Sequence, residues 1–219
     1  MSAMVDHLVV AAATLEQGAA WCEQWLGVAP GAGGKHVSMG THNRLLAIGS
    51  AAFPMAYLEI IAHDPEAPPP SRPRWFGLDD AALQTRLRER PRLLHIVARS
   101  TQLDATLAAL REQGLDAGQV VAAERASPQG LYRWRIAGRP DGQLLCGGAL
   151  PTLIEWQGMH PSEHLPASGV ALQSLQLGGL AEPVVAALGL HGVGCASRGA
   201  ALRAVFETPR GTVQLSSDN

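Results

Sequence analysis

The sequence is poor in cysteine, with only Cys22, Cys146 and Cys195 among its 219 residues. These cysteines are odd in number, far apart and without the close pairs of a zinc-finger motif. Neither a disulfide framework nor a cysteine-based metal site is indicated, and buried thiols in a reducing compartment are favoured. We therefore expect a cytoplasmic protein.

The sequence also has little excess charge and no long apolar run. Seventeen basic residues stand against 19 acidic ones, a formal net charge of −2. That balance leaves no broad basic face for nucleic acid and no polybasic membrane anchor. Asp6 and His7 interrupt the apolar N-terminal stretch, and no segment reaches the roughly 20 apolar residues of a membrane span. The expected partner is a small molecule, not nucleic acid or a membrane.

What the sequence does contain is an internal repeat, whose first copy covers residues 1–64. Residues 5–11 predict a strand that is apolar on both faces, with His7 as its polar exception. Thr14 and Gln17 form a capping box that opens a helix, and Gly27 is a typical helix end. After a glycine-rich loop at residues 31–34, three further strands are predicted at residues 36–40, 43–48 and 56–62.

Residues 65–91 separate the two copies. Five prolines between Pro65 and Pro73 predict an extended linker, because proline cannot donate to a helix or a central strand. Residues 79–90 then predict a short connecting helix, with Leu83 and Leu87 on one face.

The second copy covers residues 92–158 and repeats the pattern. An apolar strand with His95 runs to residue 98, and a helix opens at Thr101 and ends at Gly114. Further strands are predicted at residues 119–124, 131–136 and 152–157. The sequence thus predicts an α+β fold in which paired strand-helix-three-strand modules form a curved sheet around a cleft.

Residues 159–219 resemble a truncated third module. A strand at 170–177, a helix at 180–188 and two strands at 201–206 and 212–216 are predicted. Gln173 and Gln176 stand where the histidine would fall, so we expect this segment to have no chemical role. It is expected to pack on the other modules or on a second subunit, and a homodimer is predicted.

Each full module offers one histidine on its first strand and one glutamate on its last strand. These are His7 and Glu59 in the first module, and His95 and Glu155 in the second. The pairs meet only if all four side chains face the same side of the curved sheet. Imidazole and carboxylate donors without thiolate suit iron, manganese, nickel, cobalt or zinc. We therefore predict a divalent metal ion held by these four residues.

Such an ion with an open coordination position would bind a substrate oxygen and stabilise the charge that appears as a neighbouring proton leaves. Glu59 or Glu155 could loosen from the ion and serve as the catalytic base. The alternative is that the histidines are hydrogen-bonded core residues and the glutamates face outward. The cleft would then be a non-catalytic pocket that binds or sequesters a small molecule.

Other polar residues are candidates for the substrate pocket. His42 and Asn43 are predicted to point into the cleft, in a polar group that also includes His36. His160 is a candidate for the pocket rim. Residues 160–164 match an inverted zinc-protease motif, but that motif requires a helix, and prolines here indicate a loop.

Three tryptophans are predicted to be core residues or pocket walls. They are Trp75, Trp134 and Trp156. Trp156 directly follows Glu155 on a predicted strand, where neighbouring side chains point to opposite faces. If Glu155 faces the cleft, Trp156 must therefore face away from it.

Taken together, these motifs resemble the vicinal oxygen chelate superfamily, and within it the glyoxalase-like domain proteins. The resemblance lies in Asp-His-Leu-Val-Val at 6–10, Gly-Thr-His-Asn-Arg-Leu-Leu at 40–46, Tyr-Leu-Glu-Ile-Ile at 57–61, and Leu-Ile-Glu-Trp with His-Pro at 153–161. It covers residues 5–166. It implies paired modules around a metal at His7, Glu59, His95 and Glu155, and a lyase, isomerase or dioxygenase acting on a small oxygenated substrate.

Overall fold

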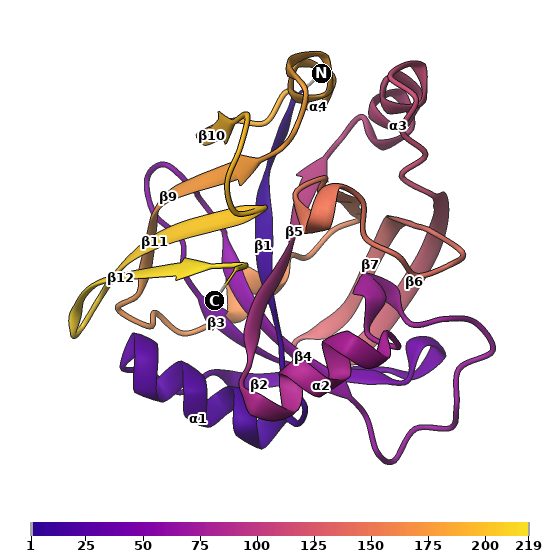
Figure 1. The fold of residues 1–219 in the computed structure, drawn as a ribbon. Coiled ribbons are helices and arrows are strands. Elements are labelled where there is room, and N and C mark those ends of the chain that lie inside the picture. The colour runs from indigo at the N-terminus through magenta and orange to yellow at the C-terminus, as the bar shows by residue number, and fades with distance from the viewer. Residues whose placement is uncertain (1, 219) are drawn as a thin grey trace.

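A strongly curved eight-stranded sheet forms the centre of the computed structural model, which describes residues 2–218 (Figure 1). Its strands lie in the order β2-β3-β4-β1-β5-β8-β7-β6. The first module contains β1 (Ala3–Ala11), α1 (Leu15–Leu26), β2 (Gly31–His36), β3 (Thr41–Ala47) and β4 (Tyr57–His63). The second contains β5 (Arg92–Ser100), α3 (Leu103–Glu112), β6 (Gln119–Ser127), β7 (Gly130–Gly138) and β8 (Thr152–Trp156). The predicted α+β fold of paired modules is confirmed.

The two modules join along their first strands. β1 pairs antiparallel with β5 at the centre of the sheet, while β1 pairs parallel with β4 and β5 pairs parallel with β8. Both central strands are covered on both faces, as their continuous apolar sequences predict. Leu8 and Val10 belong to one buried apolar cluster, and Val9 and Ala11 belong to a second cluster on the other face. The second face is the inner one, which carries the cleft.

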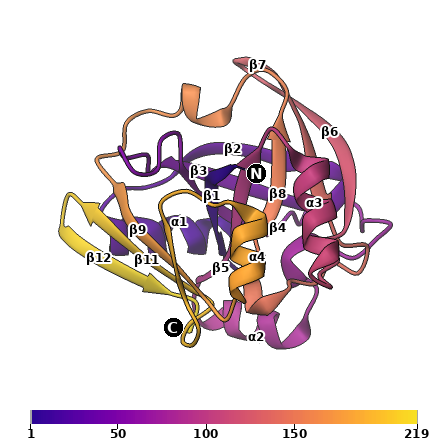
Figure 2. The ribbon, with the colours of Figure 1, turned by 90° about the horizontal axis from the view of Figure 1, so that it is seen from above.

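The C-terminal segment forms a separate four-stranded sheet, seen beside the main sheet in Figure 2. It contains β9 (Ala171–Gly178), α4 (Glu182–Leu188), β10 (Val193–Ala196), β11 (Leu202–Thr208) and β12 (Gly211–Ser216). Leu172 and Phe206 are fully buried in the same apolar cluster as Leu8 of the first module. The segment therefore packs on the other two modules, as expected, and strand β10 is an addition to the prediction. The homodimer stays a prediction.

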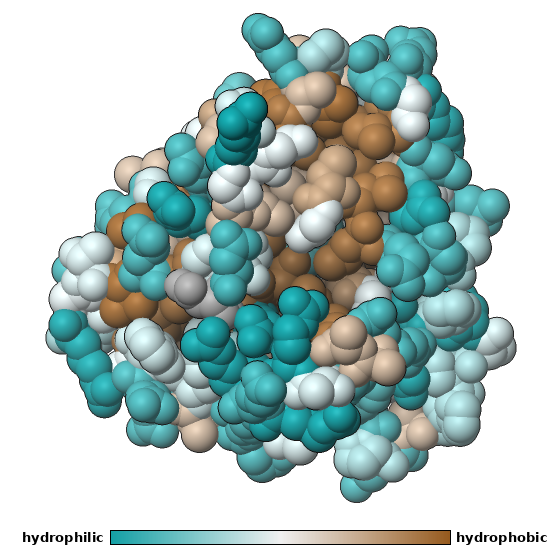
Figure 3. All heavy atoms as spheres, viewed as in Figure 1, coloured by the Kyte–Doolittle hydropathy of each residue, from teal (hydrophilic) through white to brown (hydrophobic). Residues whose placement is uncertain are grey.

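Apolar side chains also remain visible on the surface beside this segment. In Figure 3 they gather in a hollow next to the C-terminal sheet, surrounded by hydrophilic residues.

The linker at residues 65–74 is irregular and α2 (Ala81–Glu89) follows it, both as predicted. Within residues 2–218, no helix is long and apolar enough to cross a membrane.

The glycine-rich segment differs from its prediction. Residues 31–36 form strand β2, and the predicted strand at 36–40 is instead a turn of 3-10 helix, Val37–Met39. A Cβ atom on Gly33 would overlap Oδ1 and the backbone carbonyl of Asn43. Glycine therefore allows β2 to approach β3 closely enough for Asn43 to bond its backbone.

The two module helices begin differently, which predicts different effects of one substitution. Thr14 Oγ1 accepts a hydrogen bond from the Gln17 backbone N–H, and Gln17 Oε1 accepts one from the Ala13 N–H. In α3 the residue before the helix is Gln102, which makes no side-chain cap. We expect Thr14→Ala to lower the free energy of unfolding by about 1 kcal/mol, and Thr101→Ala to change it by much less. Denaturant titration of both variants would measure this, and equal losses would contradict it.

Candidate active site

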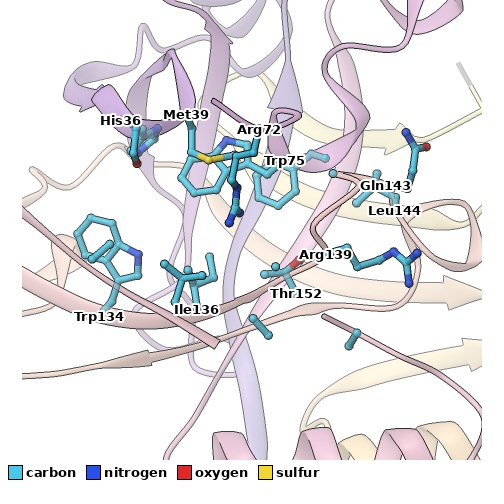
Figure 4. Close-up of a pocket in the computed structure, with 18 of the residues that line it drawn as sticks. His36, Met39, Arg72, Trp75, Trp134, Ile136, Arg139, Gln143, Leu144 and Thr152 are labelled. Atoms are coloured by element: carbon cyan, nitrogen blue, oxygen red, sulfur yellow. The ribbon is translucent and has the colours of Figure 1, made fainter. Parts of the chain in front are cut away.

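A cavity of about 700 Å³ opens along the inner face of the sheet (Figure 4). Its walls are mostly apolar and come from both modules and the linker. Among the lining residues are His36, Trp75, Trp134, Ile136 and Thr152. This volume lies within the range of pockets that enclose small ligands.

The inner end of the cavity is a small compartment of about 50 Å³. It shares His36, Trp75 and Trp134 with the large cavity, so the two spaces adjoin. His7 and Glu59 line only the inner compartment. The site therefore combines a roomy, mostly apolar chamber with a buried end that holds the contact between His7 and Glu59.

His7 and Glu59 face each other across neighbouring strands. In the parallel β1–β4 pair, His7 lies opposite Tyr57 and Glu59 lies opposite Val9, which places all of these side chains on the inner face. His7 Nε2 is 3.5 Å from Glu59 Oε2, and the two residues are 5% and 6% exposed. Tyr57 stacks on the His7 ring at 4.6 Å between centroids. The sequence prediction that His7 and Glu59 meet agrees with this geometry.

Asp6 supports His7 from behind and is absent from the predicted site residues. A β-bulge between Val5 and His7 leaves Asp6 without a partner on β5. Its fully buried carboxylate accepts hydrogen bonds from His7 Nδ1 at 2.6 Å, from Trp156 Nε1 at 2.9 Å and from His160 Nε2 at 2.9 Å. A charged residue beside His7 in an otherwise apolar strand is the sequence signal that could have identified it.

The contacts among Asp6, His7 and Glu59 keep all three side chains ionised. Burial lowers the pKa of His7, but hydrogen bonds to Asp6 and Glu59 and their negative charges outweigh it and raise that pKa to about 9. Burial raises the pKa of Glu59, but the bond to His7 and its charge, with help from His36 and Asn43, lower it to about 2. Burial also raises the pKa of Asp6, but the hydrogen bonds from His160 and His7 outweigh it and hold that pKa far below its usual range.

Asn43 orients the other side of Glu59. Its Nδ2 donates to Glu59 Oε1 at 2.6 Å, and its Oδ1 accepts from the backbone N–H of Gly34 at 2.7 Å. The same Nδ2 lies 3.3 Å from His36 Nε2. Burial lowers the pKa of His36 to about 4, so this imidazole is neutral near pH 7. Asn43 thus lies in the site as predicted, and His36 is a further site residue that the sequence indicates only as part of a polar group.

The second-module residues are not brought to this pair. His95 is on the inner face, but its Nδ1 donates to the Gly148 carbonyl at 2.9 Å. Its Nε2 accepts a hydrogen bond from Thr152 Oγ1 at 2.9 Å. Burial lowers the pKa of His95 to about 4. Glu155 points to the opposite face, where its Oε2 accepts from Arg135 at 2.7 Å beside α3. Trp156 takes the inner face in its place, which reverses the expected orientation of these two neighbours.

The other predicted pocket residues are divided between the two faces. His42 lies 3.9 Å from Asp64 and lines neither compartment, because its neighbour Asn43 takes the inner face. His160 is buried behind the compartment, where it bonds to Asp6 and does not form a rim.

The donor set does not fit the metal centre expected from the sequence. Two of the four expected ligands, His7 and Glu59, are close together, while His95 and Glu155 are bonded elsewhere. Over residues 2–218, no three His, Cys, Asp or Glu side chains are grouped so that they could hold a metal ion. Catalytic zinc sites use three protein ligands and leave one position open. The acid and base groups at this site are its own side chains, His7 and Glu59.

The sequence profile of the glyoxalase-like domain matches residues 5–190, most of the chain. The chain belongs to the glyoxalase-like domain family. This membership confirms the resemblance that the motifs of the two modules indicated. A search of curated proteins found no match.

Solved structures similar to this glyoxalase-like protein match it at low sequence identity. A hypothetical protein from Staphylococcus aureus is 14% identical with a TM-score of 0.54, covering 80% of this chain and 69% of that one. Methylmalonyl-CoA epimerase from Streptomyces coelicolor, in complex with 2-nitronate-propionyl-CoA, is 19% identical with a TM-score of 0.44, covering 71% and 96%. The same enzyme from Mycobacterium tuberculosis is 20% identical with a TM-score of 0.39, covering 69% and 85%.

Proposed function

We propose that this glyoxalase-like protein is an enzyme of the isomerase or lyase class that moves a proton on a carbon next to a carbonyl group. The observation that supports this most is the buried pair of His7 and Glu59 at the inner end of the cavity. A carboxylate base and an imidazolium acid, 3.5 Å apart in a buried site, are the two groups that enolate formation needs.

In the proposed reaction, the Glu59 carboxylate removes the proton from the substrate carbon. The electron pair of the broken C–H bond moves to the carbonyl oxygen, and His7 Nε2–H stabilises the resulting oxyanion. Glu59 then returns the proton to the same or a neighbouring carbon, which completes an isomerisation. In a lyase, the enolate electron pair instead forms a carbon–carbon double bond while the bond from the adjacent carbon to the leaving group breaks. The electron pair of that bond departs with the leaving group, which takes the proton from Glu59.

Substrate binding would strengthen Glu59 as a base. Burial alone raises the pKa of Glu59, and its contact with His7 is the main cause that lowers it. A substrate oxygen that accepts the His7 Nε2–H takes over this contact, so the pKa of Glu59 rises toward neutrality. Asp6 keeps His7 charged throughout, and Asn43 holds Glu59 Oε1 in place.

The divalent metal predicted from the sequence has no step in this proposal. Iron, manganese, nickel, cobalt or zinc would find only His7 and Glu59 of the expected ligands at the site, and the dioxygenase reaction would need such an ion. The alternative function is that the cavity binds a small molecule without changing it, which its volume alone would also permit.

Deuterium exchange in D₂O tests the proposal directly, because it reports breakage of the C–H bond whatever the final product is. A panel of 2-oxo and 3-oxo acids and ketones is incubated with the protein, with and without a strong chelator, and exchange is followed by proton NMR. We expect catalysed exchange that the chelator does not reduce. Tight binding without exchange would support the binding protein instead. Loss of exchange with chelator and recovery with added metal would show that His7 is not the acid group.

A further inference from the structure

We propose that the large cavity selects an amphipathic oxo acid, whose carboxylate is bound by Arg72 and Trp75 and whose apolar tail fills the chamber. This inference rests on the proposed function and names its substrate class. Figure 4 shows Arg72 and Trp75 on one side of the cavity, with Trp134 and Ile136 on the other side.

Two buried donors in this cavity have no acceptor. Arg72 Nε and Trp75 Nε1 are screened from solvent, and neither makes a hydrogen bond within the described part of the chain. A buried N–H without a partner destabilises the protein, because the group has lost its hydrogen bonds to water. A ligand that brings acceptor oxygens between the two side chains would remove that cost, and a carboxylate offers two such oxygens.

The cavity also has positive charge that no carboxylate neutralises. Arg72 and Arg125 both line it, and over residues 2–218 neither has an acidic side chain within ion-pair distance. Two other cations of the same lining differ in this respect, since Arg139 pairs with Asp141 and Lys35 pairs with Glu66. A guanidinium is well suited to an oxyanion that approaches through the cavity.

The rest of the chamber suits an apolar tail. Its walls include Met39, Trp134, Ile136, Leu144 and Leu150. Val37, which is 67% exposed, and Val121, which is 38% exposed, also belong to the lining, so apolar surface continues outward from the chamber. An alkyl or aryl chain would remove this surface from water, which favours binding.

The position of Trp75 relates the two ends of the ligand. Trp75 and Arg125 line both the large chamber and the inner compartment with Glu59. A carboxylate at Trp75 therefore lies where the two spaces meet, so the carbons next to it lie at the mouth of the inner compartment and the rest of the chain extends into the large chamber. A carbonyl group next to the carboxylate is then the polar part of the ligand nearest the compartment that His7 lines.

Calorimetric titration with 2-oxodecanoate and with the neutral 2-decanone tests this inference. We expect 2-oxodecanoate to bind at least tenfold more tightly. Trp75→Phe and Arg72→Gln should each weaken 2-oxodecanoate binding roughly tenfold and leave 2-decanone binding unchanged. Trp134→Phe and Arg139→Gln are matched controls from the same lining, and they should not change the ratio of the two affinities. Equal affinities for the two ligands, or an unchanged ratio in both test variants, would overturn the inference.

Failure of this inference is distinguishable from failure of the proposed function. Glu59→Gln should bind 2-oxodecanoate as the wild type does and lose exchange. Acid-selective binding without exchange in the wild type would keep the inference and contradict the function. Catalysed exchange of neutral ketones, with no preference for binding the oxo acid, would support the proposed function and contradict the inference. If Trp75→Phe fails to fold, as judged by circular dichroism, Arg72→Gln alone decides the result.

Discussion

Replacing Glu59 with glutamine is expected to lower the rate of substrate deuterium exchange by about 10²–10⁴-fold, the usual contribution of a general base. Glutamine preserves the shape of the side chain and can still bond Asn43, but it cannot accept a proton from carbon. Substrate affinity should change little, because the substrate is held mainly by the large cavity. The rate constant and the affinity are separated by following exchange at saturating and at low substrate concentration.

Glu155→Gln is the matched control for this experiment. Glu155 occupies the position in the second module that Glu59 occupies in the first. Its carboxylate, however, pairs with Arg135 on the other face of the sheet. The control variant should therefore exchange substrate at nearly the wild-type rate. A large loss in Glu155→Gln together with a small loss in Glu59→Gln would refute the assignment of the base.

The modules could be predicted because their local signals agree with the final fold. The capping box at Thr14 and the left-handed Gly27 set the ends of α1, and both are present in the structure. Strands β1 and β5 are apolar on both faces because helices, the linker and the C-terminal sheet cover the main sheet. Periodicity reports burial directly, so most elements of the two full modules followed from it. The glycine-rich strand β2 and the exposed strand β10 did not.

The side of the sheet that a residue faces could not be predicted with the same security. A shift of one residue moves a strand side chain to the opposite face, and β8 has only five residues to establish its direction. The sequence prediction therefore assigned Glu155 and Trp156 to the wrong faces of the sheet. The neighbouring strand held the missing signal, because Arg135 lies opposite Glu155 and Trp134 lies opposite Trp156.

The contacts that complete the site depend on irregular backbone, which periodicity does not report. The bulge at Asp6 brings a second carboxylate to His7. The glycines of β2 let the Gly34 N–H reach Asn43, which then orients Glu59. Both features join segments that are distant in the sequence, so the sequence could name Asn43 as a candidate but not its function.

The buried histidines predict that stability is greatest near pH 6.5. His7 keeps its proton in the folded state up to about pH 9, whereas an unfolded histidine loses it near 6.5. The folded state binds more protons in that interval, so the free energy of unfolding falls as pH rises through it. His36 and His95 have the opposite shift, with folded pKa values of about 4. Their contribution is complete above pH 6.5 and is lost as pH falls toward 4.

Each of these pKa shifts predicts a loss on the order of 3 kcal/mol in the free energy of unfolding, since one pKa unit corresponds to about 1.4 kcal/mol. The lowered pKa values of Asp6 and Glu59 arise from the same interaction as the raised pKa of His7, so they are not counted separately. Denaturant titrations at pH 4.5, 6.5 and 9 would measure both limbs. His7→Gln should be less stable at pH 6.5 and should lose most of the alkaline limb, because no imidazolium then bridges the two carboxylates. His95→Gln should retain the alkaline limb and lose part of the acid one. A wild-type stability that stays level between pH 6.5 and 9 would mean that His7 is neutral in the folded protein, and the acid role proposed for it would fail with that result.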